Sequence, residues 1–138
     1  MGTTKLEEII KANEGFSRTA YKCTAGKLTV GYGHNLEDTG LSPDEALYLL
    51  RNQLGKIRDA LDGLGLLSPG HPSNQEIVLF DMAFNMGLSG LLKFKKMLAA
   101  YHIADYETAA VEILDSAYGR GDTRRRAERN AVLMRGRE

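Results

Sequence analysis

Apolar residues recur at intervals of three and four along most of the chain, which is the spacing of one face of an α-helix. The first such stretch starts at a capping box, Thr4-Lys5-Leu6-Glu7, and continues through Ile9 and Ile10. Gly15 follows Glu14, and glycine is the residue type that helices favour just beyond their last turn. The pattern therefore predicts a short amphipathic helix that ends at Glu14.

A second, longer helix is predicted over about residues 43–61. The segment Ser42-Pro43-Asp44-Glu45 combines an N-cap serine, a proline at the first helical position and a capping glutamate. An apolar stripe follows at spacings of four and three, and it consists of Ala46, Leu50, Leu54, Ile57 and Leu61. At 1.5 Å per residue such a helix is roughly 28 Å long, enough to connect two lobes.

The rest of the chain is also predicted to be helical. After a loop rich in Gly and Pro, a capping box at residues 73–76 precedes an apolar run from Ile77 to Met86, which is typical of a buried central helix. Gly87 is expected to end that helix. Further amphipathic stretches predict helices at about 90–102, 105–117 and 123–135, with methionines 82, 86, 97 and 134 at core positions.

One segment near the start alternates with a period of two. Residues 19–23 and 28–32 flank a glycine-containing turn, which predicts a β-hairpin. Thr29, Gly31 and Gly33 fall on one face of the second arm and leave room for another group to approach the backbone. The expected fold is α+β and mostly helical, with a small hairpin lobe (about 14–42), a linking helix (about 43–61) and a larger helical lobe (about 62–138, plus the N-terminal helix) in one domain, 1–138.

Composition and charge fit one globular domain with a basic end. The 138 residues are 43% hydrophobic and 26% charged, and the formal net charge is zero. Residues 120–138 contain seven arginines (120, 124, 125, 126, 129, 135 and 137) against three acidic residues (122, 128 and 138). We expect this end to form a cleft wall and a solvated helix face. Nucleic-acid binding is the less favoured alternative, because there is no recognition motif.

The remaining polar residues predict no metal and no cofactor. His34, His71 and His102 are scattered without metal-ligand spacing, and His34 is expected to be a structural hydrogen-bonding residue. A single cysteine, Cys23, cannot form an internal disulfide. The first eight residues are acidic where a signal peptide is basic and then apolar. The chain is therefore expected to be made in a cytoplasm and to stay there unless something else releases it.

Three side chains within residues 14–34 have chemistry suited to cleaving a glycosidic bond. Glu14, at a predicted helix C-terminus, meets the negative end of the helix dipole, which favours the protonated form that a general acid needs. Cys23 and Thr29 lie on opposite arms of the hairpin. A thiolate supplies an anionic partner, and a threonine hydroxyl can hold a water. An acid, an anionic partner and a positioned water are the groups that glycoside hydrolysis requires.

The same segment resembles the signature of the phage-type lysozymes, family twenty-four of the glycoside hydrolases. Their pattern is Glu, eight residues, Asp or Cys, five residues and Thr, followed by a glycine-rich strand end with His. Here those positions are Glu14, Cys23, Thr29 and the segment Gly31-Tyr32-Gly33-His34. The likeness continues along nearly all of the chain, through residues 41–46, 84–87, 116–118 and 126–127.

The resemblance implies a two-lobed lysozyme fold and a muramidase. It makes Glu14 the general acid, places Cys23 at the usual Asp position and gives Thr29 the attacking water to orient. The substrate that it implies is the β-1,4 bond between N-acetylmuramic acid and N-acetylglucosamine in peptidoglycan. The implied substrate-binding residues are Tyr32, Asn85, Tyr118 and Arg126.

Two of these assignments leave alternatives open. Arg126 matches an arginine that pairs with the catalytic Glu, but the register at 119–126 shifts by one residue, so Arg125 is its rival. Cys23 in place of Asp allows a thiolate either to deprotonate water, with inversion, or to attack the sugar carbon directly. The water route is favoured because Thr29 is present.

The resemblance also implies a setting and two rival functions. A phage or prophage endolysin of this type would act as a monomer. It would reach the periplasmic cell wall after a holin-like membrane protein permeabilises the membrane. The rivals are a catalytically inactive, peptidoglycan-binding module and a lytic transglycosylase. The stretch from residue 34 to 41 is short for the family, which predicts a small lobe with one strand fewer.

Overall fold

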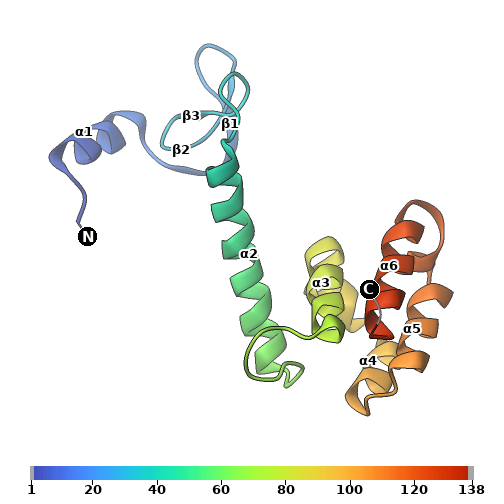
Figure 1. Ribbon diagram of the computed structural model, residues 1–138. Coiled ribbons are helices and arrows are strands. Elements are labelled where there is room, and N and C mark those ends of the chain that lie inside the picture. Colours follow the sequence, from blue (N-terminus) through green and yellow to red (C-terminus); the bar gives the residue numbers. More distant parts are fainter. Residues whose placement is uncertain (1, 137–138) are drawn as a thin grey trace. The chain divides into compact units, whose positions relative to one another are not determined.

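The computed structural model describes residues 2–136, and most of them are helical (Figure 1). The helices are α1 (Lys5–Glu14), α2 (Pro43–Gly63), α3 (Asn74–Leu92), α4 (Lys95–His102), α5 (Tyr106–Asp115) and α6 (Arg124–Met134). Two 3-10 turns, η1 (Ala117–Gly119) and η2 (Gly121–Thr123), join α5 to α6. The strands are β1 (Ser17–Lys22), β2 (Leu28–Gly31) and β3 (His34–Asn35). This is the predicted α+β class. Residues 137 and 138 of the basic end lie outside the described residues.

The chain forms two compact units, Met1–Leu49 and Leu50–Glu138. The first unit contains α1, the three strands and the first turns of α2, and the second contains the rest of α2 and all later elements. The boundary falls inside α2, which is helical over the range predicted for the linking helix.

In the first unit, α1 begins and ends where its capping residues predict. The Thr4 hydroxyl accepts a hydrogen bond from the Glu7 N–H, and the Glu7 carboxylate accepts one from the Thr4 N–H, both at 3.1 Å. Gly15 has a φ of 73°, and its N–H donates to the Lys11 carbonyl at 2.8 Å. Glu14 is therefore the last residue of the helix.

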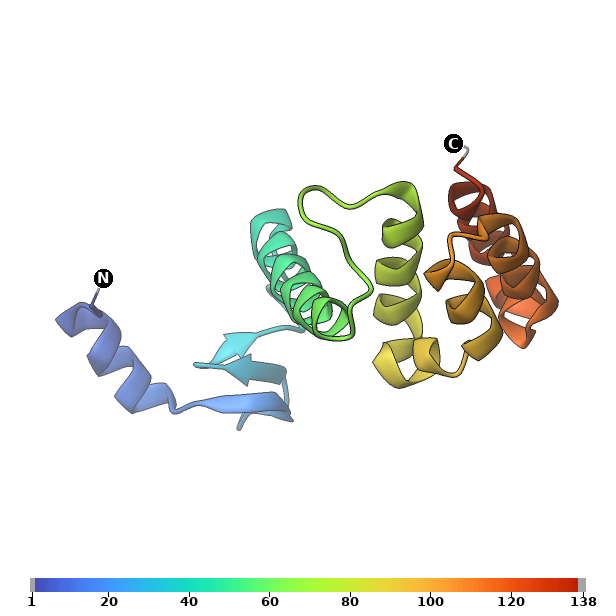
Figure 2. The ribbon, with the colours of Figure 1, turned by 90° about the horizontal axis from the view of Figure 1, so that it is seen from below.

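The three strands form one antiparallel sheet in the order β1-β2-β3 (Figure 2). Tyr21 pairs with Thr29 across the predicted hairpin, and Val30 pairs with His34 on the other side. The hairpin is thus confirmed, and β3 extends it by a two-residue strand. The His34 ring nitrogen Nε2 donates to the Gly40 carbonyl at 2.6 Å, which confirms the structural role expected of this histidine.

The second unit is built around a continuous hydrophobic core. The part of α2 that belongs to this unit contributes the buried Leu61, while Leu54 and Ile57 pack against the core as partly buried residues. The apolar run of α3 is buried at Val78, Leu79, Phe80, Met82 and Ala83, as predicted for a central helix. Its two ends are less buried than predicted, because Ile77 and Phe84 are 41% and 42% exposed. The largest fully buried side chains are Leu61, Leu79, Met82, Leu91, Met97, Ile113, Met134 and Val78.

Glycine interrupts α3 at the position where the sequence predicts an end. Gly87 has a φ of 79° and a ψ of 163°, so the helix is broken there and resumes as far as Leu92. The helix predicted over 90–102 is likewise interrupted before α4 begins at Lys95. Within residues 2–136 no single helix is long and apolar enough to cross a membrane. By length and composition α3 and α4 pass that test only as a pair, and the pair is bent by 101°.

Candidate active site

The Glu14 carboxylate lies against the backbone just beyond the end of β2. A Cβ atom placed on Gly33 would stand 2.9 Å from Cδ and 3.1 Å from Cγ of Glu14, and it would clash still more closely with Oε2. Gly33 also has a φ of +73°, a conformation that side chains with a Cβ rarely adopt. Glycine is therefore required here, and the group that uses the predicted small face is the Glu14 carboxylate.

Tyr32 connects the end of α1 to the sheet. Its ring centroid lies 5.1 Å from that of Phe16, which follows α1, with the two planes inclined by 47°. The Lys11 Nζ, in the last turn of α1, lies 5.1 Å from the centroid of the Tyr32 ring, within the range of a cation–π interaction. Since Tyr32 is still 47% exposed, part of its ring remains free to contact a ligand.

Cys23 and Thr29 are brought together by the turn between β1 and β2. The Lys27 carbonyl accepts the Cys23 N–H at 2.9 Å and the Thr29 hydroxyl at 2.8 Å. Hydrogen bonds from the backbone of Lys27 and Ala25, together with the neighbouring Thr29 hydroxyl, lower the pKa of the Cys23 thiol and outweigh the opposing effect of burial. The thiolate form is thus easier to reach than in a free cysteine.

Two contacts link the predicted catalytic residues to the same β-ribbon. Thr29 contacts Cys23, and Gly33 contacts Glu14. Gly33 follows Thr29 by four positions, so their Cα atoms are at most about 14 Å apart. The structure therefore gathers the three predicted catalytic residues around β2, in one unit.

The other predicted substrate-binding residues, at positions 85, 118 and 126, lie in the second unit. Arg126, on α6, donates two hydrogen bonds to Asp81 of α3, from Nε to Oδ2 at 2.8 Å and from Nη2 to Oδ1 at 2.6 Å. The resemblance implied Glu14 as the partner of this arginine, and that pairing stays a prediction. Arg125, the rival position, is exposed on α6, and Asn85 is exposed on α3 one turn after Asp81.

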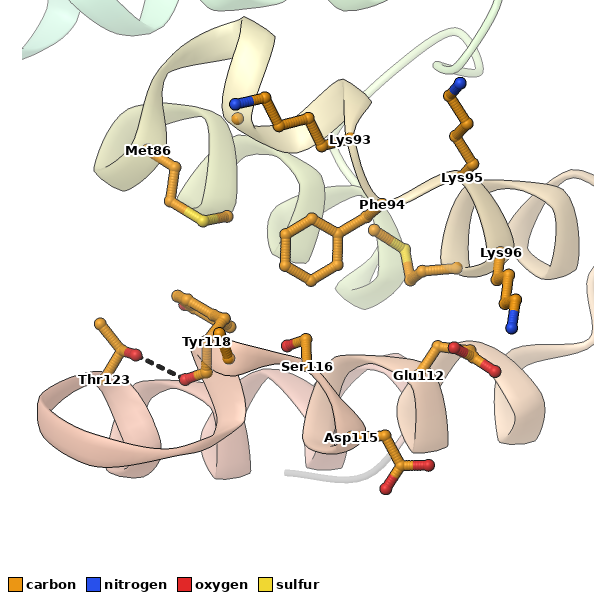
Figure 3. Close-up of a pocket in the computed structure, with 13 residues that line it drawn as sticks. Met86, Lys93, Phe94, Lys95, Lys96, Glu112, Asp115, Ser116, Tyr118 and Thr123 are labelled. Atoms are coloured by element: carbon orange, nitrogen blue, oxygen red, sulfur yellow. Dashed lines mark hydrogen bonds between the residues drawn. The ribbon is translucent and has the colours of Figure 1, made fainter.

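A cavity of about 750 Å³ lies beside Tyr118 (Figure 3). Met86 and Phe94 stand on one side of it, and Glu112, Ser116 and Tyr118 stand on the other. The rings of Phe94 and Tyr118 meet edge to face, with centroids 6.1 Å apart and planes at 90°. The cavity falls within the usual size range of small-molecule sites.

Two residues that were not predicted from the sequence, Asp81 and Asn130, form hydrogen bonds with Arg126 and Tyr118. Asp81 is the one charged residue in the apolar run 77–86, and that isolation is the signal that points to it. The Arg126 hydrogen bonds hold the pKa of Asp81 below its usual range, against the effect of partial burial. Asn130 is buried, and its side-chain nitrogen donates to Asp81 Oδ2 at 2.9 Å and to the Tyr118 hydroxyl at 3.0 Å.

Comparison with known proteins gives a consistent result. The phage lysozyme family model matches residues 11–129. An endolysin from Acyrthosiphon pisum secondary endosymbiont phage 1 is 27% identical over 110 residues, covering 77% of this chain and 73% of that protein. A probable T4-type lysozyme 2 from Dictyostelium discoideum is 26% identical, covering 83% and 85%. The pre-baseplate central spike protein Gp5 of Enterobacteria phage T4 is 25% identical, and the match covers 94% of this chain but only 27% of that protein.

Proposed function

Because the chain belongs to the phage lysozyme family, we propose that it is a muramidase acting on bacterial peptidoglycan. The bond cleaved is the β-1,4 bond from N-acetylmuramic acid to N-acetylglucosamine. One observation carries this proposal: a carboxylic acid, Glu14, packed against Gly33 on the same β-ribbon as the paired Cys23 and Thr29. These are the groups that glycoside hydrolysis requires.

In the proposed reaction, Glu14 is the general acid. It gives its proton to the glycosidic oxygen, O4 of N-acetylglucosamine, while the bond from that oxygen to C1 of N-acetylmuramic acid breaks. A water adds to C1, and the proton that the water loses goes to the Cys23 thiolate. The net change is addition of one water across the bond, with Glu14 left ionised and Cys23 left protonated before both are reset by solvent.

Thr29 favours water as the nucleophile over the sulfur. Its hydroxyl donates to the Lys27 carbonyl at 2.8 Å, so its free lone pairs are available to accept a hydrogen bond from a water beside the thiol. The lowered pKa of the Cys23 thiol supports a role as base near neutral pH. Retained activity in Cys23→Asp, together with loss of activity on alkylation of the wild type, is the result expected of a base. Equal activity before and after complete alkylation would remove Cys23 from the mechanism.

We assign the binding of the sugar chain to the four residues that the family resemblance implies, Tyr32, Asn85, Tyr118 and Arg126. Tyr32 offers a partly exposed ring in the first unit. Asn85, Tyr118 and Arg126 are the groups of the second unit that the family resemblance implies, and Tyr118 lines the cavity of about 750 Å³. In the cell, the proposed role is that of a phage or prophage endolysin. It acts as a monomer that reaches the periplasmic wall through a holin-like membrane protein.

The test is release of reducing ends from purified peptidoglycan by wild type, Glu14→Gln and Glu8→Gln. Glu8 is an exposed acid on the same helix, so its variant is a matched control. Loss of a general acid lowers the rate by about 10²- to 10⁴-fold, and we expect that loss in Glu14→Gln alone, with an unchanged melting temperature. Equal rates in all three proteins would exclude Glu14 as the acid. Binding of peptidoglycan by the wild type without any release would instead support an inactive module.

A further inference from the structure

Asp81 is the centre of a hydrogen-bond network between α3 and α6. Its two carboxylate oxygens accept three hydrogen bonds, two from Arg126 and one from Asn130. The ion pair is half-buried, with the Arg126 and Asp81 side chains 34% and 31% exposed. A bidentate guanidinium–carboxylate pair fixes both distance and plane, so Asp81 determines the direction in which Arg126 points.

The same carboxylate fixes the orientation of the Asn130 amide. An ionised carboxylate only accepts hydrogen bonds, so the amide must turn its nitrogen and not its oxygen toward Asp81. The second hydrogen of that nitrogen then faces the Tyr118 hydroxyl, which lies 3.0 Å away and must act as the acceptor. The hydroxyl proton of Tyr118 is consequently left available to donate to another group.

Asp81 therefore sits among all three residues of the second unit that are assigned to substrate. It binds Arg126 directly and Tyr118 through Asn130. It also precedes Asn85 by four residues on α3, and residues at that spacing share a face of a helix. The Thr123 hydroxyl donates to the Tyr118 carbonyl (Figure 3), which holds the backbone of Tyr118 in place independently of Asp81.

We propose that Asp81 is a positioning residue for the reaction: it orients the guanidinium of Arg126 and, through Asn130, the hydroxyl of Tyr118 toward the substrate. This inference rests on the proposed function, because it takes Arg126 and Tyr118 to be substrate-binding groups. Asp81 is called a positioning residue because it acts through Arg126 and Asn130. Its effect is on how well the sugar chain is held, and the bond-breaking step at Glu14 does not depend on it.

The experiment compares steady-state kinetics of wild type, Asp81→Asn and Glu107→Gln on soluble peptidoglycan fragments. Glu107 accepts hydrogen bonds from Arg135 at 3.0 and 3.1 Å, so it is a matched carboxylate–arginine pair in the same unit that touches none of the assigned residues. We expect KM to rise about 10- to 100-fold in Asp81→Asn, as loss of charge-assisted hydrogen bonds implies, with kcat within about twofold. Glu107→Gln should change neither.

The split between KM and kcat separates positioning from mere stability. A variant that only unfolds more readily has fewer active molecules, which lowers the apparent kcat and leaves KM unchanged. Wild-type KM in a folded Asp81→Asn protein would overturn the inference while leaving the muramidase assignment intact. Should Asp81→Asn not fold, Asn130→Ala tests the same network through Tyr118 alone. In Asn130→Ala, a rise in KM that is smaller than the rise in Tyr118→Phe supports the proposal, and an unchanged KM contradicts it.

A second measurement does not depend on activity. In ¹⁵N-labelled protein without substrate, the Arg126 Nε–H and the Asn130 side-chain amide should both exchange slowly with solvent in the wild type and in Glu107→Gln. Both signals should lose that protection in Asp81→Asn. If the wild type released no sugar but this pattern appeared, the proposed function would fail and the network would stand. If protection survived in Asp81→Asn, the positioning role would be excluded whatever the activity.

Discussion

Residues 2–49 and residues 50–136 differ in what holds their side chains in place. The second set contains every buried apolar side chain of the described chain, from Leu61 to Met134. In the first set the one buried residue is polar, Thr29, at 4% exposure. Yet Glu14, Cys23 and Thr29, the predicted catalytic residues, all lie in the first set. The predicted catalytic groups are thus positioned by caps, turns and one close glycine contact, in the set of described residues that has no apolar core of its own.

The capping boxes of α1 and α3 have the same motif but differ in burial between the two units. In α1 the Thr4–Glu7 box is exposed, whereas the Ser73–Glu76 box of α3 is part-buried and its glutamate is only 4% exposed. Glu76 also accepts a hydrogen bond from the Ser68 N–H, eight residues away. A motif that sets a helix boundary locally in the first unit therefore also joins a loop to the core in the second.

The largest effect on stability is expected in the core of the second unit. Ile113 is fully buried on α5, and Val111 on the same helix is 40% exposed. Ile113→Ala should lower the free energy of unfolding by about 2–5 kcal/mol, because it leaves a cavity. Val111→Ala should change it by no more than about 0.5 kcal/mol. Urea titration of both variants measures the difference, and similar losses would contradict the assignment of the core.

The next largest effect is expected on activity, at Gly33. Gly33→Ala would drive a methyl group into the Glu14 carboxylate, and displacement of a catalytic group can lower the rate by about 10²-fold. Gly40→Ala is the control, because Gly40 also has a positive φ, +65°, but its added Cβ would meet nothing within 4 Å. Both variants should lose similar stability, and only Gly33→Ala should lose most of its reducing-end release. Equal activities would mean that the Glu14 position is not set by this contact.

A smaller effect is expected from the two capping glutamates. Burial of Glu76 opposes its charge, but hydrogen bonds from Ser73 and Ser68 outweigh this and lower its pKa. Glu76→Gln should cost about 1–3 kcal/mol at pH 7, as loss of buried hydrogen bonds does. Glu7→Gln, at an exposed box, should shift the melting temperature much less.

The pH dependence follows from the lowered pKa of Glu76. A carboxyl with a folded-state pKa below its unfolded value of about 4.5 stabilises the protein above that value, and the contribution is lost as pH falls through the folded pKa. The difference between wild type and Glu76→Gln should therefore shrink below about pH 4.5. A difference that grew on acidification would contradict the sign of the shift.

The smallest effect is expected in the reactivity of Cys23. Its lowered pKa increases the thiolate fraction at neutral pH, but a less basic thiolate is also a weaker nucleophile, so the two changes partly cancel. Iodoacetamide should alkylate the native protein only severalfold faster at pH 7 than the chain unfolded in urea. Thr29→Val should reduce that advantage, and Thr29→Ser should preserve it. Slower alkylation of the native protein would indicate that the thiol is protected and not activated.

The local structure around Glu14, Cys23 and Thr29 is predictable from the sequence because its determinants are local. The end of α1 at Glu14, the hairpin and its small face all follow from capping, turn and alternation patterns over a few residues. The two-residue strand β3 is too short to produce such a pattern. The sequence also does not predict that the Glu14 carboxylate approaches Gly33. That contact is between the end of α1 and the segment after β2, and it depends on the backbone conformation of Gly33.

The second unit's network was less predictable because its members are far apart in the sequence. Asp81 and Arg126 are separated by 45 positions, and no periodicity relates them. The lone charge in an apolar helix indicates that Asp81 has a partner, but only the packing of α3 against α6 identifies it as Arg126. Likewise, amphipathic spacing predicts one helix over 90–102 and does not reveal the break between α3 and α4. That break depends on the packing of the chain beyond Gly87.

Hydrolysis of purified peptidoglycan in H₂¹⁸O, followed by borohydride reduction and mass spectrometry, is the sharpest test of the proposal that Glu14 drives hydrolysis of this bond. We expect one ¹⁸O per cleaved bond, at C1 of a new N-acetylmuramic acid end, and none with Glu14→Gln. Products that end in 1,6-anhydro sugars without ¹⁸O, or new ends on N-acetylglucosamine, would contradict it.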